Sequence, residues 1–386
     1  MIPNTTLQWP GVIEFGAGKL KSLPNHLAGH RSIFILADIP VKAALEPVIS
    51  DLKQRHCRVM LSTDVVPEPP FEALEKLLEP VHEFEPDAVV GVGGGSAMDM
   101  AKLVAVLFPG EQKPHEVVGI GNVHGRPVKL IAVATTSGTG SEVTPIAVLT
   151  DVTQKLKKGV VSKYLVPDVA IVDPELTRSL PAAVTAATGM DAMTHCIEAY
   201  TNRHAHPIID VIALEGIRLM GGALETAVHD GQNMDARTAM ALGSLYGGMC
   251  LGPVNTAAVH ALAYPLGGEF KVAHGLSNSV LLPFVMAFNL PACITKYAKI
   301  AAALGVPQAG SDEAMARQAI HAVRRLSISC GIPSSLNEFS IPEPAIPAMA
   351  AAAMQVKRLL DNNPREVTLA DAEAIFRNAY HGRLND

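Results

Sequence analysis

The sequence has few aromatic residues and a single tryptophan among 386 residues, although 48% of its residues are hydrophobic. A chain of this composition packs its interior with Ala, Leu, Val and Met, and its length favours two domains over one. It also lacks any run of lysine or arginine, and its formal net charge is −6. Because phosphate backbones bind to concentrated positive charge, this pattern argues against a nucleic-acid partner.

Cysteine is scarce as well. The five cysteines are far apart and form no Cys-x-x-Cys pair, which argues against a zinc knuckle or a thioredoxin-like motif. Dispersed thiols in apolar surroundings are typical of reduced, cytoplasmic proteins. The N-terminus lacks a basic region followed by an apolar core, so we expect no signal peptide. The Ala-rich run at 345–356 is too short to span a bilayer, so we also expect no membrane partner.

The first half of the chain does have an alternation of short β-rich runs with helical stretches. The runs are rich in Val, Ile and Leu, and they cover residues 32–38, 58–66, 87–95 and 129–142, the last of which breaks into small polar residues. This alternation predicts a parallel sheet with helices on both faces, that is, an α/β dinucleotide-binding domain of Rossmann-like type.

The second half has a different character. After residues 167–181 almost no strand pattern remains, and helical segments separated by Pro and Gly continue to the C-terminus. We therefore predict an α/β domain over residues 1–178 and an all-helical domain over residues 179–386. A cleft between two such domains is the default place for a ligand site.

Two loops in the first half have the composition of phosphate-binding segments. "GVGGGSAMDMAK" (91–102) follows a strand and opens a helix, whose N-terminal N–H groups attract anions. It is neither a standard dinucleotide fingerprint nor a Walker A loop, and a tight turn without a ligand is the alternative. "TTSGTGSE" (135–142) ends the next strand. Two such loops at neighbouring strand ends favour one bound nucleotide.

Asp38 closes the first strand, "SIFILAD". A carboxylate at a strand end can accept hydrogen bonds from a ribose diol and repel a 2′-phosphate. The sequence is equally consistent with Asp38 as an N-cap of the following helix.

The helical half contains a set of potential metal ligands. In "GMDAMTHCIEAY" (189–200), Asp191 and His195 lie four residues apart on one helix face, and His260 and His274 follow in "VHALAYPLGGEFKVAHGLSNS". One carboxylate and three imidazoles suit a divalent first-row metal such as Fe(II) or Zn(II), because Mg²⁺ and Ca²⁺ prefer oxygen ligands. Ordinary core histidines and a helix-stabilising Asp–His pair are the alternative interpretation.

Six motifs follow one another along the chain: "GGGSAMDMAK", "TTSGTGSEVTP", "PDVAIVDPELTRSLP", "GMDAMTHCIEAY", "VHALAYPLGG" and "AHGLSNSVLLP". In this order and spacing, they resemble the iron-containing (group III) alcohol dehydrogenase family over nearly the whole chain. The resemblance implies that family's fold, which is dehydroquinate synthase-like, with an all-α metal-binding domain after the dinucleotide-binding domain. It also implies an NAD-linked alcohol dehydrogenase.

The resemblance further implies a role for each matching residue. Asp191, His195, His260 and His274 look like the ligands of Fe(II), with Zn(II) as the other candidate. The residues that match nucleotide contacts of the family are Gly94, Gly95 and Ser96 at the pyrophosphate with Asp99 nearby, Thr135, Thr136 and Thr139 on the nucleotide and nicotinamide side, Lys157 near the nicotinamide ribose, and Asp38 for a preference for NAD over NADP.

One position departs from the family pattern. Family members often have His-x-x-x-His where this chain has "HALAY", so Tyr264 replaces the second histidine. That histidine is usually not a ligand but lies near the substrate. The resemblance therefore leaves the metal ligands unchanged, removes a histidine proton relay, and places Tyr264 among the catalytic residues.

The substrate implied by the resemblance is a small primary alcohol, diol or hydroxy acid together with its carbonyl partner. A homodimer or larger homo-oligomer is also implied. Maleylacetate reductase-like and glycerol dehydrogenase-like enzymes share the fold and are alternatives. A non-catalytic nucleotide- or metal-binding protein is a further alternative, because a fold alone does not prove a function.

Overall fold

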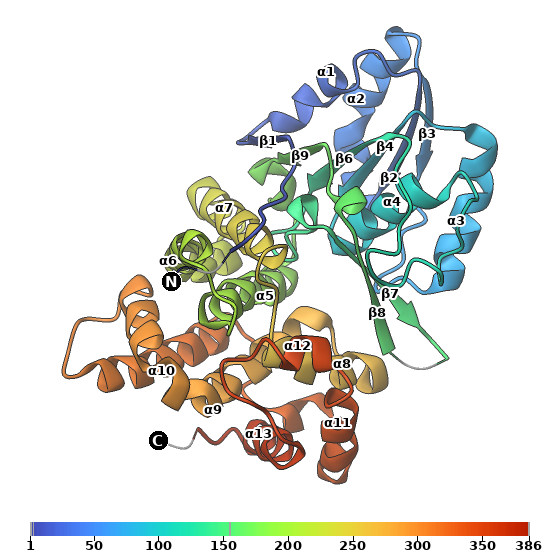
Figure 1. The fold of residues 1–386 in the computed structure, drawn as a ribbon. Coiled ribbons are helices and arrows are strands. Elements are labelled where there is room, and N and C mark those ends of the chain that lie inside the picture. Colours follow the sequence, from blue (N-terminus) through green and yellow to red (C-terminus); the bar gives the residue numbers. More distant parts are fainter. Residues whose placement is uncertain (1, 3, 154–155, 385–386) are drawn as a thin grey trace. The chain divides into compact units, whose positions relative to one another are not determined.

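The computed structural model describes residues 2, 4–153 and 156–384, which form two compact units (Figure 1). One unit is Leu7–Arg178, and the other is Ser179–Asp386 together with Met1–Thr6. All strands of the described residues lie in the first unit, whereas the regular elements of the described residues after Ser179 are helices. The parallel sheet and the helical C-terminal part confirm the predicted fold class.

A six-stranded parallel sheet forms the centre of the first unit. In spatial order its strands are β1 (Val12–Phe15), β9 (Val169–Val172), β6 (Lys129–Ala134), β4 (Ala88–Gly93), β2 (Ser32–Ala37) and β3 (Arg58–Ser62). From β2 the chain moves outward to β3, then crosses back to β4 on the other side of β2. This reversal matches the flavodoxin-like doubly wound order, in which ligands bind at the carboxyl ends of the strands beside the switch.

Helices cover both faces of this sheet. The helices of the unit are α1 (Leu23–His26), α2 (Lys42–Gln54), α3 (Phe71–Phe84) and α4 (Gly95–Leu107). Ile33 and Ile35 of β2 are buried in one core with residues of α1 and α2. Phe34 and Leu36, which point to the opposite face, are buried with residues of α3 and α4. Burial on both faces explains why the strands are continuous apolar runs in the sequence.

A second, smaller sheet was not predicted from the sequence. It consists of β5 (Gly119–Ile120), β8 (Leu156–Val161) and β7 (Ile146–Asp151). Its strands β7 and β8 pair antiparallel. They are only partly buried, and β8 begins with a leucine and two lysines, so they lack the apolar character of the central strands.

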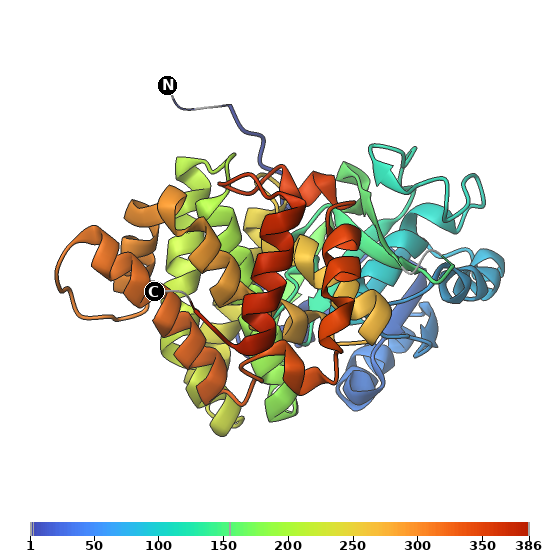
Figure 2. The same ribbon diagram turned by 90° about the horizontal axis from the view of Figure 1, so that it is seen from below.

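The second unit is a bundle of helices. They are α5 (Ala182–Thr201), α6 (Pro207–His229), α7 (Met234–Leu251), α8 (Ala258–Phe270), α9 (His274–Ala303), α10 (Asp312–Ser329), α11 (Ile346–Ala353), α12 (Lys357–Leu360) and α13 (Leu369–His381). α5 packs against α6, α7 and α9 and is buried throughout its second half. Figure 2 shows the C-terminal helices α11 and α13 side by side.

α9 is the most extended apolar segment in the described part of the chain. It has 30 residues, and an 18-residue window within it has a mean hydropathy of 1.5, so by length and composition alone it is long and apolar enough to cross a membrane. However, 67% of that window is buried inside the structure, and core helices of soluble proteins pass the same test. The Ala-rich run singled out in the sequence forms only the shorter helix α11.

Candidate metal centre and nucleotide site

Three loops meet at the carboxyl ends of the neighbouring strands β2, β4 and β6. Asp38 follows β2, and its Oδ2 accepts a hydrogen bond of 2.7 Å from the N–H of Gly94, which follows β4. On the other side, the N–H of Thr135 donates to the backbone oxygen of Gly93 at 3.0 Å. The loops thus form one surface around the N-terminus of α4, where unpaired N–H groups favour an anionic ligand.

The carboxylate of Asp38 is directed at the glycine loop and does not cap a helix. Asp38 precedes the short 3₁₀ turn Ile39–Val41, but its side chain makes no capping hydrogen bond there. Burial raises the pKa of Asp38, and the hydrogen bond from Gly94 lowers it in part. A Cβ at Gly93 would lie 2.4 Å from Asp38 Oδ2, so only glycine allows this close contact.

The three predicted threonines lie beside the glycine loop. A Cβ at Gly94 would lie 3.4 Å from Thr136 Cγ2, and one at Gly95 would lie 2.7 Å from Thr139 Cγ2. Thr135 joins the same surface through its backbone contact with β4. The small residues therefore keep the two loops in contact.

Two charged residues of α4 fasten the loop after β6 to the helix. Asp99 accepts hydrogen bonds from Ser141 Oγ at 2.6 Å and from the N–H of Val148 at 2.9 Å. One turn later, Lys102 Nζ donates to the backbone oxygen of Thr144 at 3.0 Å. Burial lowers the pKa of Lys102 to about 8, while Asp99 is the main charge that raises it. Both oxygens of Asp99 are thus hydrogen-bonded within the protein.

Ser96 and Lys157 are connected through Glu68, a residue that the sequence analysis missed. Ser96 Oγ accepts a hydrogen bond of 3.2 Å from the N–H of Glu68, and the Glu68 carboxylate pairs with Lys157 Nζ at 2.8 Å. Glu68 has a left-handed backbone with a φ of 49° and lies in a proline-rich turn. Such a turn has no residue pattern that would have singled out Glu68.

The potential metal ligands come together in the helical unit. α5 supplies Asp191 and His195, α8 supplies His260, and His274 is the first residue of α9. The Oδ1 atom of Asp191 lies 3.8, 3.6 and 3.8 Å from the Nε2 atoms of His195, His260 and His274, respectively. We refer to these four residues as the cage. The side chain of His274 is 29% exposed and forms its open side, whereas the other three are buried.

The dimensions of the cage fit a divalent first-row metal. Ligand atoms about 2.1 Å from a tetrahedral ion are about 3.4 Å apart, close to the observed spacing. The side chains of Asp191, His195 and His260 form the one group of three or more His, Cys, Asp or Glu in the described residues that could hold a metal ion. A mixed set of nitrogen and oxygen donors selects Fe(II) or Zn(II) over Mg²⁺ or Ca²⁺.

Close packing of helices places His274 within reach of Asp191. The connection from α8 turns at Lys271, which has a left-handed φ of 58°. The first turn of α9 then lies directly on α5, because a Cβ at Gly275 would be only 2.4 Å from the backbone oxygen of Ala187. Any larger residue than glycine after His274 would move that imidazole away from the cage.

The surroundings of Asp191 favour its ionised form, which is the form that binds a metal. Burial raises the pKa of Asp191, but the three histidines and Asn278 lower this pKa by more than burial raises it. The net result is a pKa of about 2. Asn278 Nδ2 lies 2.6 Å from Asp191 Oδ1, 3.1 Å from His260 Nε2 and 3.2 Å from His274 Nε2. One amide hydrogen of Asn278 is donated to Asp191 Oδ1, and the second can be donated to Nε2 of either His260 or His274.

Tyr264 lies one helical turn beyond His260 on α8. Burial raises the pKa of Tyr264, a hydrogen bond from Arg358 of α12 lowers it in part, and the charge of Glu198 raises it. Because the guanidinium can only donate, Tyr264 Oη accepts in its contact with Arg358.

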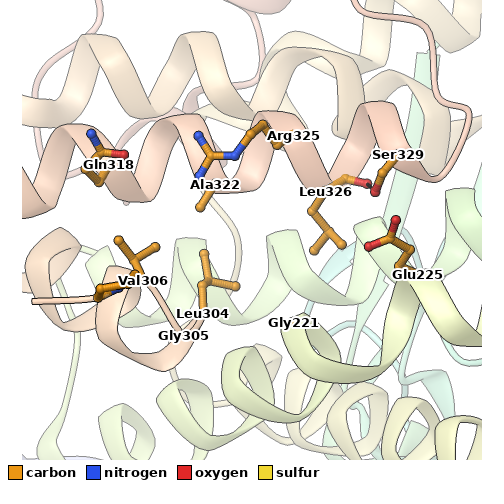
Figure 3. A pocket seen from close by; sticks show the side chains of 11 residues that line it. Gly221, Glu225, Leu304, Gly305, Val306, Gln318, Ala322, Arg325, Leu326 and Ser329 are labelled. Atoms are coloured by element: carbon orange, nitrogen blue, oxygen red, sulfur yellow. Dashed lines mark hydrogen bonds between the residues drawn. The ribbon is translucent and has the colours of Figure 1, made fainter.

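A separate cavity of about 430 Å³ lies beside α6 and α10 in the helical unit (Figure 3). Its charged lining residues are Glu225 and Arg325, and Leu304 forms part of its apolar lining. None of its lining residues belongs to the cage. This cavity is therefore distinct from the cage.

Comparison with known families agrees with this geometry. Residues 10–174 match the family model described as iron-containing alcohol dehydrogenase, and residues 185–380 match the C-terminal part of the Fe-containing alcohol dehydrogenase family. The chain belongs to the iron-containing alcohol dehydrogenase family. This membership confirms the predicted resemblance and the predicted class, an oxidoreductase acting on alcohols.

Individual relatives align over almost the full chain. Long-chain-alcohol dehydrogenase 1 of Geobacillus thermodenitrificans is 41% identical over 97% of both chains. The NAD-dependent methanol dehydrogenase of Bacillus methanolicus is 34% identical over 96% of this chain and 98% of its own. Among solved structures, a 1,3-propanediol oxidoreductase superposes with a TM-score of 0.93 at 35% identity, covering 98% of this chain and 100% of its own.

Replacing His260 by alanine should remove metal from the cage, because the remaining ligands cannot complete the set. Elemental analysis of protein loaded anaerobically with Fe(II) checks this. His229→Ala on the surface of α6 serves as the control and should keep its metal. Full metal content in His260→Ala would contradict the assignment of this ligand.

Proposed function

We propose that this chain is a metal-dependent, NAD(H)-linked alcohol dehydrogenase that interconverts a small primary alcohol, diol or hydroxy acid and its carbonyl partner. The observation that carries the proposal is the cage, in which Asp191 Oδ1 faces three imidazole nitrogens at 3.6–3.8 Å. Membership of an iron-containing family supports Fe(II) as the ion, and the same donors also suit Zn(II).

The helical unit, residues 179–386, is the metal-binding domain in this proposal. A divalent ion held by the cage supplies Lewis acidity toward the substrate oxygen. Asp191 provides the one charged ligand, while His195, His260 and His274 bind as neutral imidazoles. The partly exposed side of the cage, at His274, is the side from which a substrate can approach.

The first unit, within the predicted domain 1–178, is the NAD-binding domain. NAD(H) supplies the hydride chemistry, and the protein binds and orients it. Gly94, Gly95 and Ser96 bind the pyrophosphate at the N-terminus of α4. The nucleotide and nicotinamide side is contacted by Thr135, Thr136 and Thr139, and Asp99 holds the loop that carries these threonines. Lys157 lies near the nicotinamide ribose. Asp38 accepts hydrogen bonds from the other ribose.

Tyr264 replaces the histidine relay of other family members. Tyr264 lies one helical turn after His260 on α8, and a tyrosine hydroxyl is a group that can pass a proton toward the substrate oxygen.

The relatives narrow the substrate class. Their names refer to long-chain alcohols, methanol and 1,3-propanediol, and methanol and 1,3-propanediol carry only primary hydroxyl groups. This supports a primary alcohol and its aldehyde over a maleylacetate reductase-like or glycerol dehydrogenase-like activity. A homo-oligomeric state and a cytoplasmic location stay predictions.

The proposed function is tested by following NADH absorbance with Fe(II)-loaded protein and a panel of aldehydes. Unbranched aliphatic aldehydes should be reduced. Removing the metal with a chelator should abolish turnover, and adding Fe(II) back should restore it. Maleylacetate, and glycerol in the oxidative direction, serve as comparison substrates. Turnover that persists without metal, or a preference for maleylacetate, would contradict the proposal.

Asp38→Gly should relax the preference for NAD over NADP by about 1–3 kcal/mol, because a carboxylate repels a 2′-phosphate and a lost charged hydrogen bond has this magnitude. Asp38→Asn is the matched variant, since it removes the charge but keeps an oxygen for the Gly94 N–H. Ratios of kcat/KM for the two cofactors provide the measurement. Wild-type ratios in both variants would show that Asp38 does not contact the ribose.

Tyr264→Phe should lower kcat by roughly 10-fold or more, because it removes a proton donor while keeping the ring. Its metal content should stay normal, since Tyr264 is not a ligand. Steady-state kinetics over a range of pH, beside elemental analysis, provide the check. Tyr380→Phe on α13 is the control, and a Tyr264→Phe enzyme with wild-type kinetics would place this phenol outside the reaction.

A further inference from the structure

Glu198 is a buried carboxylate of α5 that belongs neither to the cage nor to the nucleotide loops. It lies on α5 seven residues after Asp191, two turns along the same helix face. Its residue is only 4% exposed. Burial of a carboxylate is costly unless its oxygens have partners, so the contacts of Glu198 indicate its purpose.

Both oxygens of Glu198 contact the beginning of α8. Oε1 accepts a hydrogen bond of 2.7 Å from the N–H of Val259, and Oε2 lies 2.5 Å from Nδ1 of His260. The first contact satisfies a helix N-terminal N–H that the residue before α8, Ala257, does not cap with its side chain. The second contact is not explained by capping, because it is made to the ring of a cage residue.

The second contact fixes the proton of His260. A carboxylate accepts, so Nδ1 of His260 carries the hydrogen and Nε2 keeps its lone pair. Nε2 is the atom that faces Asp191 Oδ1 at 3.6 Å and Asn278 Nδ2 at 3.1 Å. The hydrogen bond from His260 to Glu198 thus points the lone pair into the cage and orients the ring.

Charge balance gives Glu198 a second reason to be there. The cage contains one carboxylate, Asp191, and three imidazoles, so a dication bound there would leave one positive charge in a buried site. Glu198 adds one negative charge next to His260. A dication, Asp191 and Glu198 together sum to zero.

We propose that Glu198 is a positioning residue that holds His260 in its metal-binding form and sets the affinity of the cage for a divalent ion. The arrangement is the carboxylate–histidine–metal relay that commonly supports metal-binding histidines. The inference rests on the metal site of the proposed function, and it adds a residue outside the cage to that site.

The test is a titration of metal-stripped protein with Co(II) in competition with a chromophoric chelator. Glu198→Gln keeps an oxygen for the Val259 N–H but no longer accepts from His260 as a carboxylate, and it should bind Co(II) about 10–100-fold more weakly. Glu198→Asp keeps the charge on a shorter side chain and should fall between this variant and the wild type. Thr201→Val, a buried hydroxyl deletion on the same helix, should bind as the wild type does.

The melting temperature of each metal-stripped variant separates positioning from folding. It should differ little between Glu198→Gln and the wild type, because the capping contact is kept. Unchanged Co(II) affinity in Glu198→Gln would overturn the proposal. A weaker affinity in Glu198→Gln together with a clearly lowered melting temperature of the metal-free protein would also overturn it. So would an equal loss of Co(II) affinity in Thr201→Val.

Failure of this inference can be distinguished from failure of the proposed function. Wild-type protein that binds Co(II), and binds it more weakly as Glu198→Gln, but reduces no aldehyde would support the positioning role and contradict the activity. An active wild-type enzyme whose Glu198→Gln variant binds Co(II) normally would contradict the positioning role alone.

Discussion

A carboxylate enclosed by three imidazoles is the constraint around which the helical unit is built. Asp191 is buried, which raises its pKa, but the surrounding histidines and Asn278 lower its pKa by more. Such an arrangement requires groups from separate helices to converge within 3.8 Å of one carboxylate oxygen. The central position of α5, the glycine at 275 and the tight turn between α8 and α9 all serve this convergence.

The sheet imposes a comparable constraint on the first unit. β3 and β4 lie on opposite sides of β2, so the chain reverses its direction across the sheet at this point. The loops after β2 and β4 therefore lie side by side at the carboxyl ends of these strands. There the Asp38 carboxylate meets the Gly94 N–H at 2.7 Å, and no side chain fits at Gly93. Topology therefore determines where this carboxylate and the glycine loop lie, and local sequence determines how closely they approach.

Much of this could be predicted from sequence because the signals are local. Continuous apolar runs such as residues 32–38 mark strands buried on both faces, and the spacing of Asp191 and His195 puts them on one helix face. The convergence of His260 and His274 on that pair is only one of two interpretations that the residues allow, because the turn between α8 and α9 decides it, and the family resemblance favours it.

Other features lacked a sequence signal for physical reasons. The strands β7 and β8 are only partly buried and carry lysines, so their pattern resembles a surface loop. Glu198 and Asn278 follow Asp191 and His274 at helical spacings, yet a glutamate or asparagine on a helix is ordinarily a solvated residue. Only their burial against the cage distinguishes them. Glu68 contacts Ser96 through a backbone N–H and has a left-handed φ, which side-chain patterns do not encode, and its partner Lys157 is 89 residues away in the sequence.

The distribution of the cage over three helices has a consequence for the stability of the folded chain. A metal bound there joins segments that are 83 residues apart at their extremes, from Asp191 to His274. Since an unfolded chain cannot hold this set together, each tenfold rise in free metal above the dissociation constant adds about 1.4 kcal/mol to the free energy of unfolding. The supply of metal in the cell would then govern what fraction of the chain is folded.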